Sequence, residues 1–254
     1  MKRKLSQSRR LRHKHTPNWL ELPLDVTASI RHRVGAIDIL ENVQKVCTTW
    51  RRICKDPAMW GVIDMRNLGD LFDMPYDLEK IASQLRRLRV VICHELLTES
   101  LNIVVKKLPL LEEFHLYYTY IDFEAIENIG CCCPLLKSFI YNQEGHTFSQ
   151  VENDEEALAI AKNMPGLRQL HLFGNKMTNI GLQAILDGCP HLDSLDLRQC
   201  FHVKLEGDLG KRCSKIKDLK RPFDSTKGYG FVTSPQNMMY SANGIFEEIF
   251  EDFW

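Results

Sequence analysis

Residues 165–172 read PGLRQLHL, and residues 190–197 read PHLDSLDL. Both octets fit the template P-x-L-x-x-L-x-L. Its last two apolar residues alternate, as they do along a short β-strand with one buried face. Segments 109–116 and 134–141 fit the same template, with Phe or Tyr at some of the apolar positions. The template therefore predicts a short strand that recurs along the chain.

The recurrence has a nearly constant period. Without the proline, the pattern also appears upstream and downstream of the four octets. The first apolar residues of the seven segments are Trp60, Leu85, Leu111, Leu136, Leu167, Leu192 and Ile216, with steps of 25, 26, 25, 31, 25 and 24 residues. A fixed period in the twenties indicates a solenoid, and this pattern resembles the leucine-rich repeat. The resemblance implies an α/β solenoid, a leucine-rich-repeat horseshoe of about six repeats over residues 62–221.

The stretches between the strands favour helices. Segments 123–129 and 180–186 place apolar residues about three positions apart, which is a helical spacing. A Cys-Pro pair at 133–134 and again at 189–190 predicts the end of each helix, because proline cannot continue it. The longest step contains the polar segment 142–156, which we expect to be a lengthened surface loop that either binds a partner or is a tolerated insertion.

The outward strand positions would line the concave surface of the horseshoe. They mix charges with aromatic rings, which favours a protein target over a nucleic-acid groove. The substrate-binding residues predicted on this basis are Glu113, His115, Tyr117, Gln169, His171, Phe173, Asp196 and Arg198, with Ser138 among the same strand positions.

Residues 17–61 read PNWLELPLDVTASIRHRVGAIDILENVQKVCTTWRRICKDPAMWG. Apolar residues recur there at helical spacing, as in Val26 with Ile30. About forty-five residues bury little surface alone, so the segment must dock on the solenoid or on a partner.

This segment resembles an F-box, a small three-helix domain. The matching elements are Leu22-Pro23, Ile30, Val46-Cys47, Trp50-Arg51 and Asp56-Pro57 with Trp60, in the order and spacing of the family motif. The chain is similar to plant F-box proteins of the leucine-rich-repeat type, the S-phase-kinase-associated-protein-interacting group. Val26 and Met59 stand where leucine is usual.

The resemblance implies a function. The chain would be the substrate-recognition subunit of an SCF-type E3 ubiquitin ligase, binding the adaptor, and through it a cullin, with the F-box and an unknown target protein with the repeats. The adaptor-binding residues carried over are Leu22, Pro23, Val26, Ile30, Leu40, Val43, Val46, Cys47, Trp50 and Trp60. The alternative is an F-box scaffold that acts outside a cullin complex.

Enzyme motifs are missing from the sequence. It contains no G-x-S-x-G, Walker loop or H-E-x-x-H, so we expect a non-catalytic subunit with no cofactor. Two C-x-H pairs, at 189–191 and 200–202, have too little spacing within each pair for a structural zinc site, and no metal is predicted.

Charge is balanced overall but uneven along the chain. The 33 Lys and Arg equal the 33 Asp and Glu, yet residues 1–15 carry seven basic residues and no acid. This arm is a nuclear-import signal, a phosphate-binding tail or a disordered leader, and we expect a nuclear and/or cytoplasmic protein. The chain begins without the apolar core of a secretory signal, and no apolar run reaches membrane-spanning length.

The C-terminal segment 222–254 contains one further motif. Residues 227–232, KGYGFV, resemble the RNP1 strand of an RNA-recognition motif, but no companion strand lies at the right distance upstream. We therefore interpret this stretch as a turn leaving the last repeat, and nucleic-acid binding as the least favoured function. The acidic–aromatic end GIFEEIFEDFW either caps the solenoid or is a disordered interaction segment.

Overall fold

The structure, a computed structural model, describes residues 45–46, 48, 50–51, 61–65, 85–91, 98–117, 121–142 and 151–227. Its strands are β1 (Val62–Met65), β2 (Arg87–Val91), β3 (Glu113–Tyr117), β4 (Ser138–Asn142), β5 (Gln169–His171), β6 (Ser194–Asp196) and β7 (Asp218–Lys220). Its helices are α5 (Thr98–Val105), α6 (Phe123–Cys132), α7 (Glu155–Asn163), α8 (Asn179–Gly188) and α9 (Gly207–Cys213).

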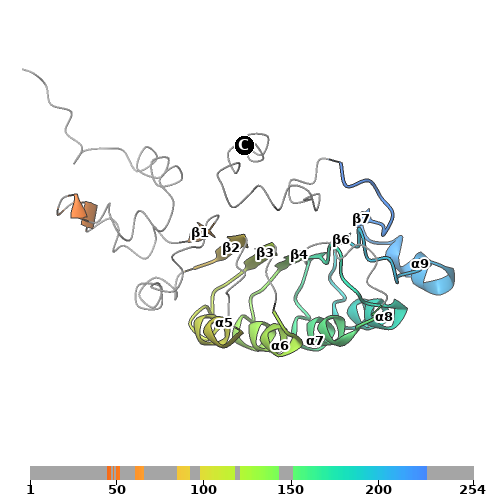
Figure 1. The fold of residues 1–254 in the computed structure, drawn as a ribbon, viewed down its shortest axis with the longest axis horizontal. Helices are drawn as coiled ribbons and strands as arrows, with labels where there is room; N and C mark the ends of the chain where they lie inside the picture. The colour runs from red at the N-terminus through yellow and green to blue at the C-terminus, as the bar shows by residue number, and fades with distance from the viewer. Residues whose placement is uncertain are drawn as a thin grey trace, which may run out of the picture.

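The seven described strands form one sheet in sequence order, and every neighbouring pair is parallel. Successive units therefore stack side by side, with the strands in one layer and helices α5–α8 in a second layer (Figure 1). This arrangement confirms the predicted leucine-rich-repeat solenoid. It contains one strand for each of the seven segments found in the sequence.

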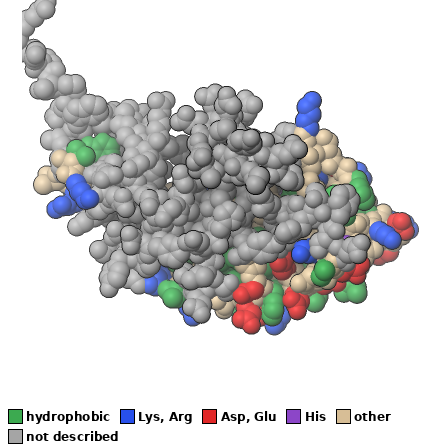
Figure 2. Space-filling model, in the orientation of Figure 1, with side chains coloured by type: hydrophobic (Ala, Val, Ile, Leu, Met, Phe, Trp, Pro, Cys, Tyr) green, Lys and Arg blue, Asp and Glu red, His purple; other side chains and the backbone are tan. Residues whose placement is uncertain are grey.

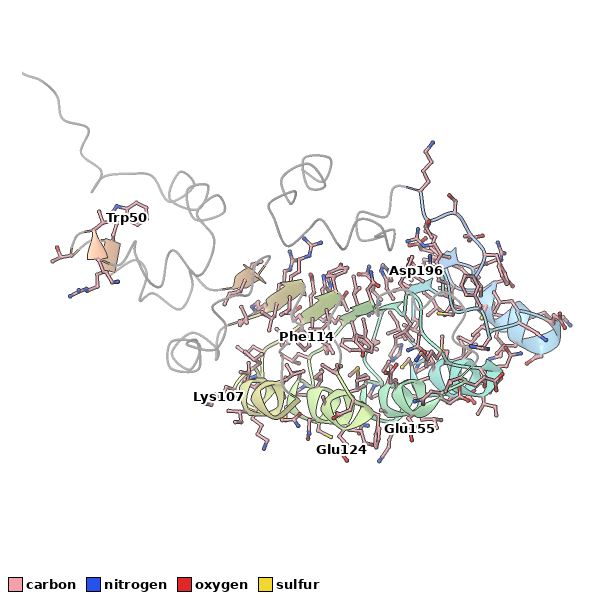
Figure 3. All side chains as sticks on the ribbon, viewed as in Figure 1. Trp50, Lys107, Phe114, Glu124, Glu155 and Asp196 are labelled. Carbon is pink, nitrogen blue, oxygen red and sulfur yellow. The ribbon has the colours of Figure 1, made fainter. Side chains whose placement is uncertain are left out.

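The register of the sheet follows the sequence repeat. Leu88 pairs with Phe114, Phe114 with Phe139, and the same position continues through Leu170 to Leu195. Because side chains alternate along a strand, each of these residues and the one two positions later face the helices. Phe114 is labelled between the two layers in Figure 3.

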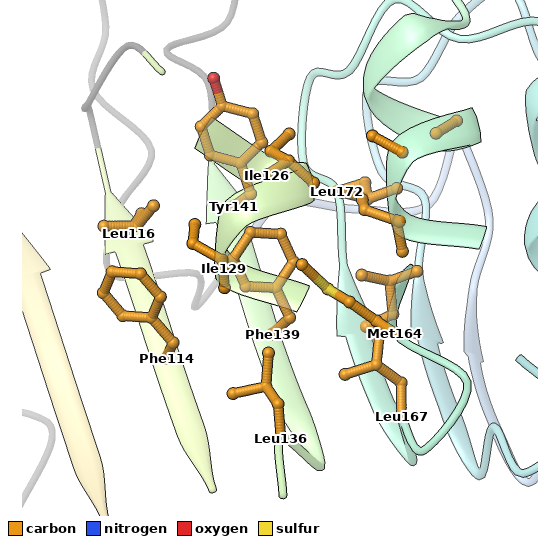
Figure 4. Close-up of a cluster of buried hydrophobic side chains, with 14 of the residues drawn as sticks. Phe114, Leu116, Ile126, Ile129, Leu136, Phe139, Tyr141, Met164, Leu167 and Leu172 are labelled. Carbon is orange, nitrogen blue, oxygen red and sulfur yellow. The ribbon is translucent and has the colours of Figure 1, made fainter. Parts of the chain in front are cut away.

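The core lies between the sheet and the helices (Figure 4). Phe114 and Phe139 are fully buried, with ring centroids 6.3 Å apart, and Phe139 stacks on Tyr141 at 6.2 Å. The buried Tyr141 hydroxyl donates to the carbonyl of Ile121 at 3.0 Å and accepts from its N–H at 3.3 Å. This polar atom therefore keeps its hydrogen bonds inside the core, as burial requires.

The helix ends follow from local sequence. Asp122 caps α6 by accepting from the N–H of Ala125, and Thr178 caps α8 by accepting from the N–H of Ile180. At the other ends, Cys133 and Cys189 are the C-cap residues, each followed by proline, as predicted. Both cysteines are buried.

The predicted loop 142–156 is shorter at both ends than expected. Asn142 is the last residue of β4 and is buried, while Glu155 and Glu156 begin α7. Asp154 is a structural residue: its carboxylate accepts from the N–H and hydroxyl of Thr178, both at 2.8 Å, and from the N–H of Gly181 at 3.0 Å. Asp154, which directly precedes α7, therefore links α7 to the start of α8 by hydrogen bonds.

Charged side chains bridge neighbouring units just before the strands. Glu112 pairs with both Arg86 and Lys137, and Asp193 pairs with Arg168 at 3.2 Å and with Lys217 at 2.8 Å. Hydrogen bonds from Lys137 and Arg86 lower the pKa of Glu112. Each carboxylate thus joins three consecutive strands at the surface.

The helical layer carries a mixed surface. In Figure 2, acidic, basic and apolar side chains are interspersed along it. Leu158 on α7 and Ile180 on α8 are among the exposed apolar residues. None of the helices in the described ranges has both the length and the apolar character that a bilayer crossing requires.

Candidate target-binding face

The side of the sheet opposite the helices presents three rows of side chains, which we call the helix-free face. Row one contains Arg87, Glu113, Ser138, Gln169, Ser194 and Asp218. Row two contains Arg89, His115, Ile140, His171, Asp196 and Lys220. Row three contains Tyr117 and Asn142, which pair in register, and continues with Phe173 and Arg198, each two residues beyond row two.

All eight predicted substrate-binding residues lie on this face, on β3, β5 and β6 and the residues that follow β5 and β6. They belong to neighbouring strands of one sheet, although 85 residues separate Glu113 from Arg198 in sequence. Figure 3 labels Asp196 on the side of the sheet away from the helices. Their grouping agrees with the sequence interpretation, while their role in binding stays a prediction.

Seven residues of the same face were not predicted, among them Ser194, Asp218 and Lys220. Arg87, Arg89, Ile140 and Asn142 occupy rows together with the predicted ones. The alternation within each strand would have identified them, since every second residue of 138–142 faces the same side.

A hydrogen-bonded series crosses the face. The His115 Nε2 and Ser138 Oγ atoms are 3.0 Å apart, and Ser138 donates to Gln169 Oε1 at 3.0 Å. Gln169 Nε2 lies 3.1 Å from His171 Nε2. At the far end, Ser194 donates to Asp218 Oδ2 at 3.0 Å. Polar side chains of rows one and two are thereby held in fixed positions.

Both histidines are neutral at ordinary pH. Burial lowers the pKa of His115 to about 3, and the nearby Arg89 adds to the effect. Burial likewise lowers the pKa of His171, although Asp196 acts in the opposite direction. A neutral imidazole suits hydrogen bonding within the series.

Aromatic rings and cations make up the rest of the face. The guanidinium of Arg89 lies 5.3 Å from the ring centroid of Tyr117, and that of Arg198 lies 5.7 Å from the ring of Phe173. Both distances are within cation–π range. Arg198 also pairs with Asp196 at 2.6 Å, and both side chains are buried.

The chemistry of these residues suits recognition. The Ser138 hydroxyl donates to an amide oxygen, and the histidines are neutral and fixed by neighbours. The buried cysteines are protonated thiols, since burial raises the pKa of Cys189 to about 11 and that of Cys200 beyond its usual range. A surface of fixed polar groups, rings and guanidiniums can bind an extended peptide.

The cysteines of the two C-x-H pairs have separate structural roles. Cys189 donates to the carbonyl of Met164 at 3.4 Å, and Cys200 donates to that of Leu172 at 2.8 Å. Within the part of the chain that the structure describes, no three potential metal ligands lie together.

The predicted adaptor-binding residues fall mostly outside the described residues. Val46 and Trp50 are described: Val46 is 70% exposed, and Trp50 is half-buried with Thr48 and Arg51 in helical conformation around it. The remaining predicted positions, Leu22, Pro23, Val26, Ile30, Leu40, Val43, Cys47 and Trp60, lie outside the described residues. Adaptor binding at these positions stays a prediction.

Comparison with known proteins identifies both modules. Residues 19–61 match the F-box domain family, close to the expected 17–61. The chain is 44% identical over 261 residues to F-box protein SKIP19 of Arabidopsis thaliana, covering 90% of this chain and 85% of that protein. It is 41% identical to putative F-box/LRR-repeat protein 22 of the same plant, covering 91% of this chain and 83% of the relative.

The leucine-rich repeat-containing protein LegL7 from Legionella pneumophila superposes with a TM-score of 0.44 at 15% identity, over 69% of this chain and 64% of that one. The solenoid assignment here rests on the seven parallel strands and their repeat register.

Proposed function

Since this chain belongs to the family of plant F-box/leucine-rich-repeat proteins, we propose that it is the substrate-recognition subunit of an SCF-type E3 ubiquitin ligase. The F-box would bind the adaptor and, through it, a cullin. The helix-free face would bind the target protein, and the ubiquitin chemistry would take place on other subunits.

One observation carries the proposal: the F-box match ends at residue 61, and the first strand of the solenoid begins at Val62. An F-box thus leads directly into the solenoid, as the proposed division between adaptor binding and target recognition requires. The fixed, chemically mixed rows of that surface support selective binding of a protein segment.

Adaptor binding is tested by co-purification. The double variant Leu22→Ala/Pro23→Ala should recover at least about tenfold less adaptor than wild type. Truncating an anchor residue of an interface typically lowers the binding free energy by about 2 kcal/mol or more. Leu158→Ala, an exposed position on α7, is the matched control and should recover adaptor normally. Equal recovery in the double variant and the control would refute the adaptor role.

The same purification separates the two F-box functions. Cullin present with the adaptor supports the ligase subunit, whereas adaptor without cullin indicates a scaffold outside the cullin complex. Targets should accumulate when the chain is deleted. Those that bind the helix-free face should be captured by wild type and not by the Phe173→Ala variant.

The proposed site of action is the nucleus and/or the cytoplasm. Replacing the seven Lys and Arg of residues 1–15 by Gln in a fluorescent fusion tests the import role of the basic arm. Loss of nuclear fluorescence is expected if the arm is an import signal, and an unchanged distribution assigns it another role.

A further inference from the structure

The centre of the helix-free face is buried. Tyr117, Ile140 and Phe173 are only 4%, 6% and 2% exposed, although they point away from the helices. At the ends of the same face, the side chains of Arg87 and Lys220 are 59% and 47% exposed. All-parallel sheets occur almost only with both faces covered. The burial is therefore local, and something covers β3 to β6.

The described chain already turns toward this face. After β7, the carbonyl of Pro222 accepts from the N–H of Gln199 at 2.9 Å, which continues the backbone bonding between repeats. The carbonyl of Ser225 then accepts from Arg198 Nη1 at 3.2 Å, a side chain of row three. Helices α5–α8 lie on the other side of the sheet (Figure 1). The contact of Ser225 with Arg198 thus places the end of the described chain beside row three at the end of β6.

The remaining C-terminal segment is long enough to cross the face. Residues 228–254 number 27 and span up to about 90 Å when extended. The distance from β7 to β2 is five strand spacings, or about 24 Å. The segment can therefore reach β2 with many residues to spare.

The end of the segment also has complementary chemistry. Residues 244–254, GIFEEIFEDFW, alternate four acids with aromatic residues. The face carries the guanidiniums of Arg87 and Arg89 beside the apolar groups of Tyr117 and Ile140, and Arg87 also pairs with Glu113 at 3.0 Å. Arg89, Tyr117 and Arg198 each have an interaction partner in the structure.

We propose that residues 228–254 bind in cis across the helix-free face, with the acidic–aromatic end over β3 and β4, beside the exposed Arg87 of β2. The chain thereby occupies its own recognition surface with an extended acidic–aromatic peptide, and a target has to displace it. A tethered peptide has an effective concentration on the order of 1 mM, so a free competitor needs a higher affinity or a comparable concentration. The binding of residues 228–254 to this face does not depend on the proposed function. The statement that a target must displace them rests on it.

Photo-crosslinking in the full-length chain tests the occupancy without target or adaptor. We place p-benzoylphenylalanine at Ile140, in the centre of the face, or at the exposed Arg87, at its far end. The probe at Arg87 keeps the test valid if the buried position does not tolerate the larger ring. Ile103, 57% exposed on α5, is the control position. Intramolecular crosslinks from positions 140 and 87 to residues 241–254 are expected, and the control should give none.

Other results would overturn the proposal. Crosslinks from position 140 to residues 143–150 would assign the cover to that neighbouring segment, and crosslinked dimers would assign it to a second copy. No crosslink from either position would mean that the face is open. Charge reversal of Glu247, Glu248, Glu251 and Asp252 to Lys should lower the crosslink yield several-fold, and an unchanged yield would contradict the charge complementarity. These outcomes do not depend on whether the F-box binds an adaptor.

Discussion

At the residue scale, the burial of His115 makes the stability of the folded protein depend on pH. Its pKa of about 3 lies below the ordinary value of 6.5, so the folded protein keeps the imidazole neutral where the unfolded chain takes up a proton. The stabilising contribution is therefore complete above about pH 6.5 and declines as the pH falls toward 3.

This contribution predicts a measurable loss of stability in mild acid. Between about pH 7.5 and pH 5.5, His115 should account for about 1 kcal/mol of lost unfolding free energy. Urea denaturation followed by circular dichroism at both pH values, in wild type and His115→Gln, measures it. The variant should lose less stability than wild type, and an equal pH dependence of the two proteins would contradict the assignment.

Asp154 provides a second test at the residue scale. It accepts three hydrogen bonds at the start of α8, so Asp154→Ala should destabilise the protein by about 2 kcal/mol in urea denaturation. Asp122→Ala is the comparison, since its carboxylate caps α6 through the N–H of Ala125, and its loss should be about 1 kcal/mol. Equal losses would show that the extra bonds of Asp154 add nothing.

At the scale of elements, glycine sets how closely two helices approach. A Cβ on Gly188 in α8 would lie 2.1 Å from the carbonyl oxygen of Ala161 in α7. Gly188→Ala should therefore push the helices apart and cost about 3 kcal/mol in the same assay. Gly166→Ala, where the nearest atom would be 3.5 Å away, should change stability by less than about 1 kcal/mol. Similar effects of the two substitutions would refute close packing at Gly188.

Sequence alone predicts the strands and helices because both carry a strong period. The positions of Phe139 and Tyr141 in the core follow from alternation, and the ends of α6 and α8 follow from Cys-Pro. Ile140 was missed because three consecutive apolar residues in β4 hide the alternation.

The remaining features depend on contacts distant in sequence. The role of Asp154 depends on Thr178, 24 residues later, and its polar surroundings look like any surface loop. The pKa of His115 depends on burial that only the assembled sheet creates. The grouping of the target-binding candidates was predictable, because it follows from strand alternation and repeat register.

At the scale of the whole molecule, stability should vary along the solenoid. Leu170 in β5 is fully buried between neighbouring units, whereas Leu219 in β7 is half-buried at the end of the sheet. Leu170→Ala should cost about 3 kcal/mol and Leu219→Ala about 1 kcal/mol in urea denaturation. Hydrogen exchange should show β7 opening without β5. Equal losses, or simultaneous exchange of both strands, would indicate that the solenoid unfolds only as a unit.

The register of the sheet has an evolutionary consequence. The step from β4 to β5 is 31 residues instead of about 25, yet Ser138 still pairs with Gln169 and Ile140 with His171. The six extra residues of this step lie outside the strands, so the rows stay aligned. Each strand contributes its own few side chains to the helix-free face, and a substitution in one repeat leaves the next in register. If this face binds targets as proposed, a change of target needs substitutions in one repeat only.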